Sequence, residues 1–392
     1  MSMSLIDRVR ERLAVEGGPL RANVVAAAIR AESGGVLGDS EVLSNLHELQ
    51  TELVGAGILE PLLRGPGTTD VLVTAPDSVW VDDGRGLRRS SVRFADEAAV
   101  RRLAQRLALS AGRRLDEAQP WVDGHLGDLG SGRTGEALTV RLHAVLPPVA
   151  AAGTCLSLRV LRPATQDLDA LVAAGAIDAK AATLLRGIIE ARLAFLVSGG
   201  TGAGKTTLLA ALLGEVPVDQ RILCVEDAAE LEPRHPHLVK LVARRANVEG
   251  VGEVTARDLV RQALRMRPDR IVVGEVRGAE VVDLLAALNT GHDGGAGTVH
   301  ANNPAEVPSR FEALAALGGL DRAALHSQLA AAIQVVLHMA RDRGGRRHLN
   351  QIGLLRREDN GQVNVLPCWA RERGFEAGAE LLDTLVCDRR RG

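Results

Sequence analysis

One eight-residue stretch restricts this chain to a small set of folds: Gly199-Gly200-Thr201-Gly202-Ala203-Gly204-Lys205-Thr206. It matches the pattern Gly-x-x-x-x-Gly-Lys-[Ser/Thr], a loop whose backbone N–H groups surround the phosphates of a nucleotide. The apolar run 193–197 precedes the loop, and the helix-forming run 207–213 follows it. Glycines without a Cβ let the backbone approach the phosphates, and the following helix adds partial positive charge at its N-terminus. The order strand, loop, helix therefore predicts an α/β fold that binds a nucleotide.

Two side chains of this loop have specific chemistry. Lys205 is expected to reach the β- and γ-phosphates, and the Thr206 hydroxyl is placed to ligate Mg²⁺. The chain has three lysines, at 180, 205 and 240, against 44 arginines, so a lysine in the loop indicates a specific requirement. The alternative is a glycine-rich turn that matches the pattern by accident, and the flanking strand and helix patterns argue against it.

A second block predicts a catalytic carboxylate. Ile271 to Val273 is a short β-branched run typical of a buried parallel strand, and Gly274 and Glu275 follow it. Ligands bind at the carboxyl edge of such a sheet. Many phosphate-loop ATPases carry a Mg²⁺-binding Asp where Gly274 stands, so the neighbouring Glu275 is the candidate that orients or deprotonates the attacking water. The alternative is a surface glutamate that caps the next helix.

Two further segments carry candidate residues. Residues 221–227 read as a strand that ends in Glu226 and Asp227, at the same edge of the sheet. Residues 289–304 bring His292 and His300 into a glycine-rich stretch. A metal site is one interpretation, but no Cys or second His pair completes a zinc set. Sensing of the γ-phosphate is preferred, and a purely structural role, more for His292 than for His300, remains the alternative.

The order of these blocks resembles the secretion ATPase superfamily of type II and type IV secretion and pilus machines, with its phosphate loop, Asp box, atypical Walker B and His box. Within this superfamily, the residues of these motifs are most similar to those of the ATPases of tight-adherence (Tad/Flp) pilus assembly. The resemblance covers about residues 60 to 340, and the segments that carry this finer likeness are 247–250, 264–270, 274–278 and 289–294.

The resemblance implies a RecA-like phosphate-loop NTPase motor domain, preceded by a smaller α+β (PAS-like) lobe and a short helical head. It implies ATP and Mg²⁺ as ligands and a homo-hexameric ring with the nucleotide between two lobes of the chain. The site residues that it implies are catalytic Glu275, a water-polarising Glu226, His292 and His300 of the His box, γ-phosphate contacts from Arg159 and Arg141, and nucleotide contacts from Gly199 through Thr206 to Thr207. Relatives more often carry Ser and a larger residue where Gly295 and Ala296 stand, and the loop from Gly124 to Gly135 looks lengthened.

Composition agrees with a motor in the cytoplasm. The chain has 392 residues and 46% hydrophobic content, enough for two cores. It opens without a signal-peptide pattern, its longest uncharged apolar stretch is broken by prolines, and its four cysteines show no disulfide or zinc spacing. A formal net charge of −2 and 2% aromatic residues argue against a nucleic-acid surface.

The expected organisation is a helical head over 1–60, an α+β lobe over 61–162, a linker over 163–166 and the ATPase domain over 167–392. In the lobe we expect strands near 70–74, 78–82, 139–145 and 155–161 and a helix over 96–110. In the motor domain we expect helices over 305–317 and 321–332 and strands over 334–339 and 348–355. Pro61 to Thr69 reads as a break, and residues 387–392 read as a loose tail.

The resulting hypothesis is a hexameric ATPase at the inner face of the cell membrane, whose hydrolysis drives pilus assembly or protein secretion through an inner-membrane platform. Two other classes stay open. A DNA-transfer motor would predict a basic stripe and DNA-stimulated turnover. A nucleotide-gated scaffold with negligible turnover would place Glu275 away from the γ-phosphate.

Overall fold

The computed structural model describes residues 8, 9, 12, 27–29, 31–33, 55–127, 138–162, 164–247 and 249–391. The chain divides into two compact units, Met1–Leu161 and Arg162–Gly392. Most of the expected helical head and of the loop 124–135, together with Pro163 of the expected linker, lies outside the described residues. Among the described residues, no helix has both the length and the apolar character needed to cross a membrane.

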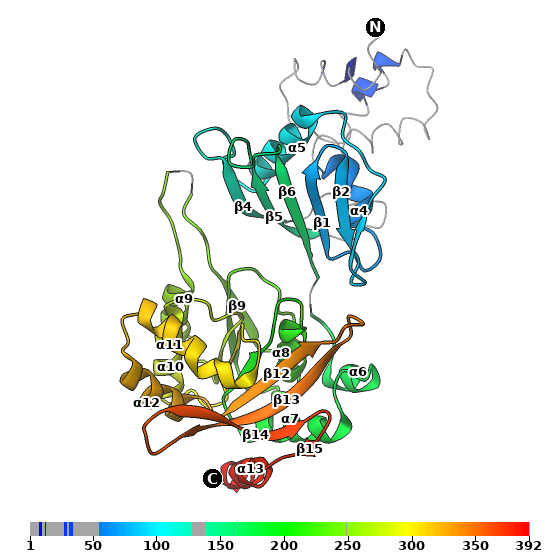
Figure 1. The fold of residues 1–392 in the computed structure, drawn as a ribbon. Helices are drawn as coiled ribbons and strands as arrows, with labels where there is room; N and C mark the ends of the chain where they lie inside the picture. The colour runs from blue at the N-terminus through cyan, green and yellow to red at the C-terminus, as the bar shows by residue number, and fades with distance from the viewer. Residues whose placement is uncertain are drawn as a thin grey trace. The chain divides into compact units, whose positions relative to one another are not determined.

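The first unit is an antiparallel sheet with a helix packed on it (Figure 1). Its strands pair in the order β3-β2-β1-β6-β5-β4. The side chains of alternate strand residues are buried, and with the apolar face of the long helix they form one core. The elements are η1 (Gly57–Leu59), α4 (Glu60–Leu63), β1 (Asp70–Ala75), β2 (Ser78–Asp82), β3 (Leu87–Arg89), α5 (Glu97–Ser110), β4 (Trp121–Leu126), β5 (Thr139–Val145) and β6 (Cys155–Leu161).

The four strands and the helix expected in this unit are all present, but Pro61 does not break the chain. It lies in the first turn of α4, where its missing N–H would have had no helical partner. The Asp96 side chain caps α5 by accepting the N–H of Ala99, which fixes the start of that helix.

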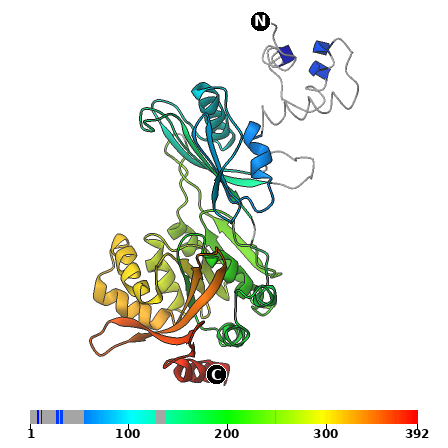
Figure 2. The ribbon, with the colours of Figure 1, turned by 45° about the vertical axis from the view of Figure 1, so that its right-hand side comes forward.

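The second unit is a nine-stranded sheet in the order β15-β14-β13-β12-β7-β11-β10-β8-β9, with helices on both faces (Figures 1 and 2). Strands from β12 to β9 pair in parallel, and β13, β14 and β15 join antiparallel. The strands are β7 (Phe195–Ser198), β8 (Ile222–Glu226), β9 (Leu238–Val242), β10 (Arg270–Val273), β11 (Ala296–Val299), β12 (Val335–Arg341), β13 (Arg347–Arg357), β14 (Val363–Ala370) and β15 (Gly374–Phe375). The helices are α6 (Leu168–Ala173), α7 (Ala179–Glu190), α8 (Lys205–Gly214), α9 (Ala256–Ala263), α10 (Glu280–Leu288), η2 (Pro304–Glu306), α11 (Val307–Leu317), α12 (Arg322–Ala332) and α13 (Ala379–Arg391).

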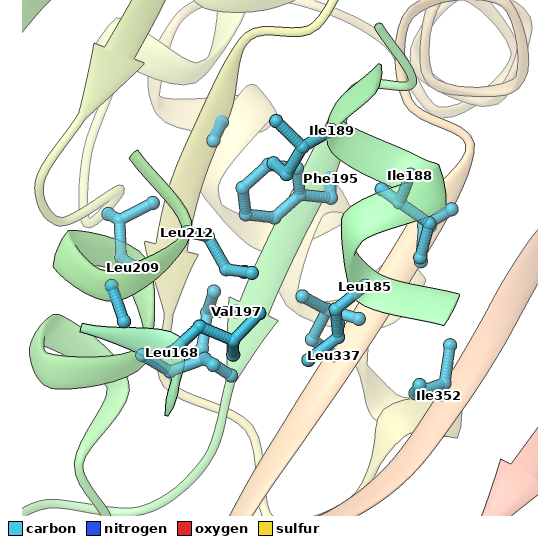
Figure 3. Packing of buried hydrophobic residues seen from close by; sticks show 14 of the residues in the cluster. Leu168, Leu185, Ile188, Ile189, Phe195, Val197, Leu209, Leu212, Leu337 and Ile352 are labelled. Carbon is cyan, nitrogen blue, oxygen red and sulfur yellow. The ribbon is translucent and has the colours of Figure 1, made fainter. Parts of the chain in front are cut away.

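Alternation along the central strands makes two cores, one on each face of this sheet. Phe195 and Val197 of β7 point into a core formed with α6, α7, α8 and α13, which Figure 3 shows from close by. Ala194 and Leu196 point into a second core formed with α9, α10, α11 and α12. Because β7 is buried on both faces, the loop that follows it is held rigidly at the carboxyl edge of the sheet.

The expectation of a loose tail over 387–392 is wrong for the residues up to Arg391, which belong to α13. Leu382 and Val386, one helical turn apart, are buried against the first core. Arg389 pairs with Asp293 at 3.3 Å, and Arg390 pairs with Glu190. Apolar burial on one side and ion pairs on the other hold the helix against the unit.

Candidate functional site

The phosphate-binding loop lies between β7 and α8, as the sequence predicts. Gly199, Gly202 and Gly204 have φ values of 147°, 71° and 94°, which side chains with a Cβ rarely adopt. A Cβ at Gly199 would lie 2.4 Å from the carbonyl oxygen of Met339 on β12, so the neighbouring strand leaves room only for glycine there. Gly204 stands at the N-terminus of α8, where the free N–H groups attract an anion.

The Lys205 side chain closes across this loop. Its Nζ donates to the carbonyl oxygens of Gly199 at 3.1 Å and Gly200 at 2.9 Å, and the residue is 8% exposed. Burial lowers the pKa of Lys205, and the charge of Glu275 opposes that shift. The loop thus holds an ammonium group inside the turn where phosphate oxygens are expected to bind.

The fit of Mg²⁺ to the site follows from its donors. Thr206 lies in the first turn of α8, so its hydroxyl is available as one ligand. Within the described ranges, no group of three or more His, Cys, Asp or Glu side chains could hold a metal ion. A divalent ion here would take most of its ligands from nucleotide phosphates and water, which is the usual arrangement for Mg²⁺.

The acidic and histidine candidates gather at the same edge because their strands are parallel. Strand β10 lies between β8 and β11. Glu226 is the last residue of β8, Glu275 follows β10 by two residues, and His300 comes directly after β11. The edge of the sheet therefore carries these three side chains together with the phosphate loop.

Glu275 contacts two partners. Its Oε1 lies 3.4 Å from Nε2 of His300, and its Oε2 lies 3.3 Å from the guanidinium of Arg277. Its side chain is 35% exposed. The N–H groups of Arg277 and Gly278, just before α10, are instead accepted by Glu280 at 2.7 and 2.8 Å. Because Glu280 satisfies these two donors, the interpretation of Glu275 as the helix cap loses its basis.

His300 joins Glu275 to the phosphate loop. Nζ of Lys205 lies 3.4 Å from its Nε2 and 3.5 Å from its Nδ1. Burial and the Lys205 charge lower the pKa of His300, and the Glu275 carboxylate opposes them. A lowered pKa favours the neutral imidazole, which has one hydrogen-bond donor and one acceptor.

Glu226 has a different environment from Glu275. It is 5% exposed, and its Oε1 accepts the N–H groups of Glu230 at 3.1 Å and Leu231 at 2.9 Å, while Oε2 is buried with no partner among the described residues. Burial raises the pKa of Glu226 to about 7. A Cβ at Gly274 would lie 2.8 Å from Glu226 Cγ, so glycine at 274 makes room for this carboxyl group.

The two histidines of the expected His box lie at opposite ends of one strand. His292 precedes β11, and its Nδ1 lies 3.1 Å from the carbonyl oxygen of Ala287, whereas His300 follows β11. Within one chain, the expectation that both face the phosphates is not met, because the length of β11 separates them. The alternative of a metal bound jointly by the two histidines fails for the same reason.

The two candidate arginines, Arg141 and Arg159, lie in the first unit, opposite each other on adjacent strands. Arg141 of β5 pairs in register with Arg159 of β6, so the two side chains are on one face of the sheet. Arg141 binds both oxygens of Asp123, at 3.1 and 2.9 Å, and Arg159 binds Asp70 at 2.9 Å.

Sequence reasoning missed His338 of β12. Its Nδ1 lies 2.9 Å from Oγ of Ser198, the residue before the phosphate loop, and it is 5% exposed. Burial lowers the pKa of His338, so it is a neutral hydrogen-bonding partner. The signal was a single histidine within the apolar run Val335-Val336-Leu337-His338-Met339, which marks a buried polar group with a partner.

Comparison with known proteins identifies the family. A family model described as Type II/IV secretion system protein matches residues 52–387. The chain belongs to this family. A putative conjugal transfer protein of Mycobacterium tuberculosis (strain H37Rv) is 75% identical over 354 residues, which are 90% of this chain and 99% of the relative. The type IV secretion system protein PtlH of Bordetella pertussis is 33% identical over 268 residues, 62% of this chain and 75% of that protein.

Two solved structures confirm the fold class. The ATPase DotB of Legionella pneumophila has a TM-score of 0.51 at 17% identity, covering 91% of this chain and 88% of that one. The pilus retraction motor PilT with bound ADP has a TM-score of 0.50 at 20% identity, covering 83% and 84%. At these identities the likeness concerns the fold, a RecA-like domain preceded by an α+β lobe. The relatives' names refer to conjugal transfer and type IV secretion, so the finer resemblance to tight-adherence pili stays a proposal.

Proposed function

We propose that this chain hydrolyses ATP as the motor of a secretion or pilus machine. The observation that carries the proposal is the contact of Lys205, in the phosphate loop, with His300 and of His300 with Glu275. This arrangement supports a site where a cation that can bind phosphate, a hydrogen-bonding imidazole and a proton-accepting carboxylate lie next to one another.

Each residue of the site has a separate role in the proposed reaction. The loop from Gly199 to Thr207 holds the phosphates, and Lys205 turns from the loop carbonyls to the β- and γ-phosphates. Thr206 and the phosphates would hold Mg²⁺, which would supply positive charge next to the leaving group. A water oxygen forms the new bond to the γ-phosphorus as the bond to the bridging oxygen breaks, and its proton passes to Glu275. His300 hydrogen-bonds the transferred group, and Glu226 is the residue that we expect to polarise the water.

The mechanical output rests on the family. We propose a homo-hexamer in the cytoplasm, docked to an inner-membrane platform, in which hydrolysis opens and closes each nucleotide site. Arg159 and Arg141 would complete the transition-state charge from outside the motor domain, as trans-acting arginines do in other nucleotide hydrolases. Assembly of a tight-adherence pilus is the specific task that the sequence motifs favour.

DNA transfer is the second candidate, and the name of the Mycobacterium tuberculosis relative favours it. A net charge of −2 weighs against a dedicated DNA surface. The two candidates differ in one measurement: turnover of a DNA motor rises when single- or double-stranded DNA is added, whereas turnover of a pilus or protein-secretion motor does not.

The proposal of hydrolysis itself is tested with Lys205→Ala. The variant should lose turnover, because several kcal/mol of phosphate stabilisation go with the ammonium group, while its fold persists. Lys180→Ala is the matched control, since Lys180 is an exposed lysine on α7. Undiminished hydrolysis in Lys205→Ala, measured as phosphate release, would remove this site from the mechanism.

A further inference from the structure

The turn between β12 and β13 lies beside the phosphate loop, on the side away from His300. In the sheet, β12 and β13 lie on one side of β7, and β11, which His300 directly follows, lies on the other. Residues 341–347 of this turn contain four arginines and one aspartate. The Asp342 side chain accepts the backbone N–H of Arg346, which shapes the turn. The turn therefore brings an excess of positive charge to the loop.

Arg347 is the arginine of this turn that touches the phosphate loop. A Cβ at Gly204 would lie 3.6 Å from Arg347 Cβ and 3.4 Å from Arg347 Cδ, so the stem of the side chain lies along Gly204. The methyl group of Met339 lies 3.4 Å from the same point and packs from β12. Arg347 is exposed, and within the described part of the chain no ion pair or hydrogen bond occupies its guanidinium.

We propose that Arg347 binds the phosphates of the nucleotide held by this loop, as a second cation from the same chain. The proposal rests on the proposed function and adds a binding residue to it. Lys205 approaches the phosphates from inside the loop, and Arg347 approaches them over Gly204 from the opposite side to His300. A guanidinium can donate two parallel N–H hydrogen bonds to phosphate oxygens, and an exposed arginine beside the phosphate loop can do so.

Within the part of the chain that the structure describes, no carboxylate pairs with Arg347, which supports this role. Arg277, which lies beside Glu275, is already paired with Asp227 and Glu275. An unpaired guanidinium whose stem is fixed against a phosphate loop loses little side-chain freedom when an anion arrives. Arg347 is thus available to the ligand without first breaking an ion pair.

The experiment measures binding of Mg·ADP and of inorganic tripolyphosphate to the full chain by calorimetry. Arg347→Ala should weaken both ligands by about tenfold or more, the worth of one charge-assisted hydrogen bond, and Arg347→Lys should recover part of the loss. The salt dependence of the affinity should also become shallower, since one phosphate contact is gone. Arg356→Ala is the matched control, an exposed arginine toward the other end of β13, and should bind as the unchanged chain does.

The outcomes separate this proposal from the function on which it rests. If Lys205→Ala abolishes binding and Arg347→Ala binds both ligands normally, the role of Arg347 is refuted and the phosphate site stands. A loss of ADP affinity with unchanged tripolyphosphate affinity also refutes it, because Arg347 would then contact the base or ribose. If Lys205→Ala binds both ligands and hydrolyses ATP normally, the proposed function itself fails.

Discussion

Nε2 of His300 lies 3.4 Å from Oε1 of Glu275, which joins the end of β11 to the loop after β10. The same imidazole lies 3.4 Å from Nζ of Lys205. Both contacts are to Nε2, which in a neutral ring either donates to Glu275 or accepts from Lys205, so a change in one contact affects the other. A γ-phosphate that draws Lys205 away from the loop carbonyls would therefore change the contact between His300 and Glu275.

Glu275→Gln should retain ATP and turn over at least about a hundredfold more slowly, because the amide can still position a water but cannot accept its proton. Binding by calorimetry and turnover by phosphate release measure the two effects separately. Glu253→Gln, an exposed glutamate in the same unit, should leave both unchanged. A variant that loses ATP affinity while hydrolysing normally would make Glu275 a metal or structural residue and give Glu226 the catalytic role.

Glu226 should make the stability of the protein depend on pH. Its folded pKa, about 7, lies above the ordinary value of 4.5, so the folded state holds the proton to higher pH than the unfolded state does. The corresponding stability is fully present below pH 4.5 and is lost as pH rises through 7, a change on the order of 3 kcal/mol.

Urea unfolding without nucleotide, between pH 5 and 8, measures this effect. Glu226→Gln should remove that pH dependence, because its amide oxygen still accepts the N–H groups of Glu230 and Leu231 but carries no titrating proton. Glu253→Gln should keep it. Parallel stability curves for Glu226→Gln and the unchanged chain would mean that Glu226 titrates normally.

Local signals were sufficient to predict the centre of the motor domain. The phosphate loop is recognisable by its residue spacing, and the runs before Glu226 and Glu275 are short, apolar and β-branched, as strands buried on both faces are. Parallel pairing then places their ends at one edge. This is why the grouping of Glu275 and His300 near Lys205 follows from residues far apart in the sequence.

Elements with mixed composition escaped prediction. Strand β4 contains Asp123, Gly124 and His125, which weaken its alternation, although Val122 and Leu126 are buried. His292 and His300 lie in one glycine-rich segment, so the sequence does not show that a strand, β11, runs between them. The direction of that strand relative to the phosphate loop decides where His292 lies. His338 and Arg347 reach the phosphate loop from strands β12 and β13, which are far from it in the sequence. No spacing in the sequence shows which strands lie next to each other in the sheet.

The C-terminal helix gives a stability test. Leu382 is fully buried in the first core, whereas the adjacent Leu381 is 45% exposed. Leu382→Ala should lower the free energy of unfolding by about 2–5 kcal/mol, the usual cost of such a cavity, and Leu381→Ala by well under 1 kcal/mol. Denaturant unfolding of both variants measures the difference. Equal losses would mean that α13 does not dock as described.

Arg159 should contribute to turnover without contributing to the fold of the phosphate site. Arg159→Ala in the full chain is expected to lower turnover by about a thousandfold or more, within the range for an arginine that stabilises transferred phosphate. Asp70→Asn removes the carboxylate that pairs with Arg159 and keeps the arginine, so it should not lower turnover. If Arg159→Ala hydrolyses ATP normally and Arg141→Ala does not, the role passes to Arg141.

The last prediction concerns assembly. If each site needs groups from a second lobe or subunit, a lone chain has the phosphate loop and Glu275 but lacks the charge that completes the transition state. Turnover should then rise more steeply than linearly with protein concentration, and a fragment that starts near Asp167 should bind nucleotide but hydrolyse it poorly. Sedimentation with and without a non-hydrolysable ATP analogue, beside the hydrolysis assay, measures both assembly and activity. A monomer that is fully active at every concentration would refute the ring, because its site would then be complete within one chain.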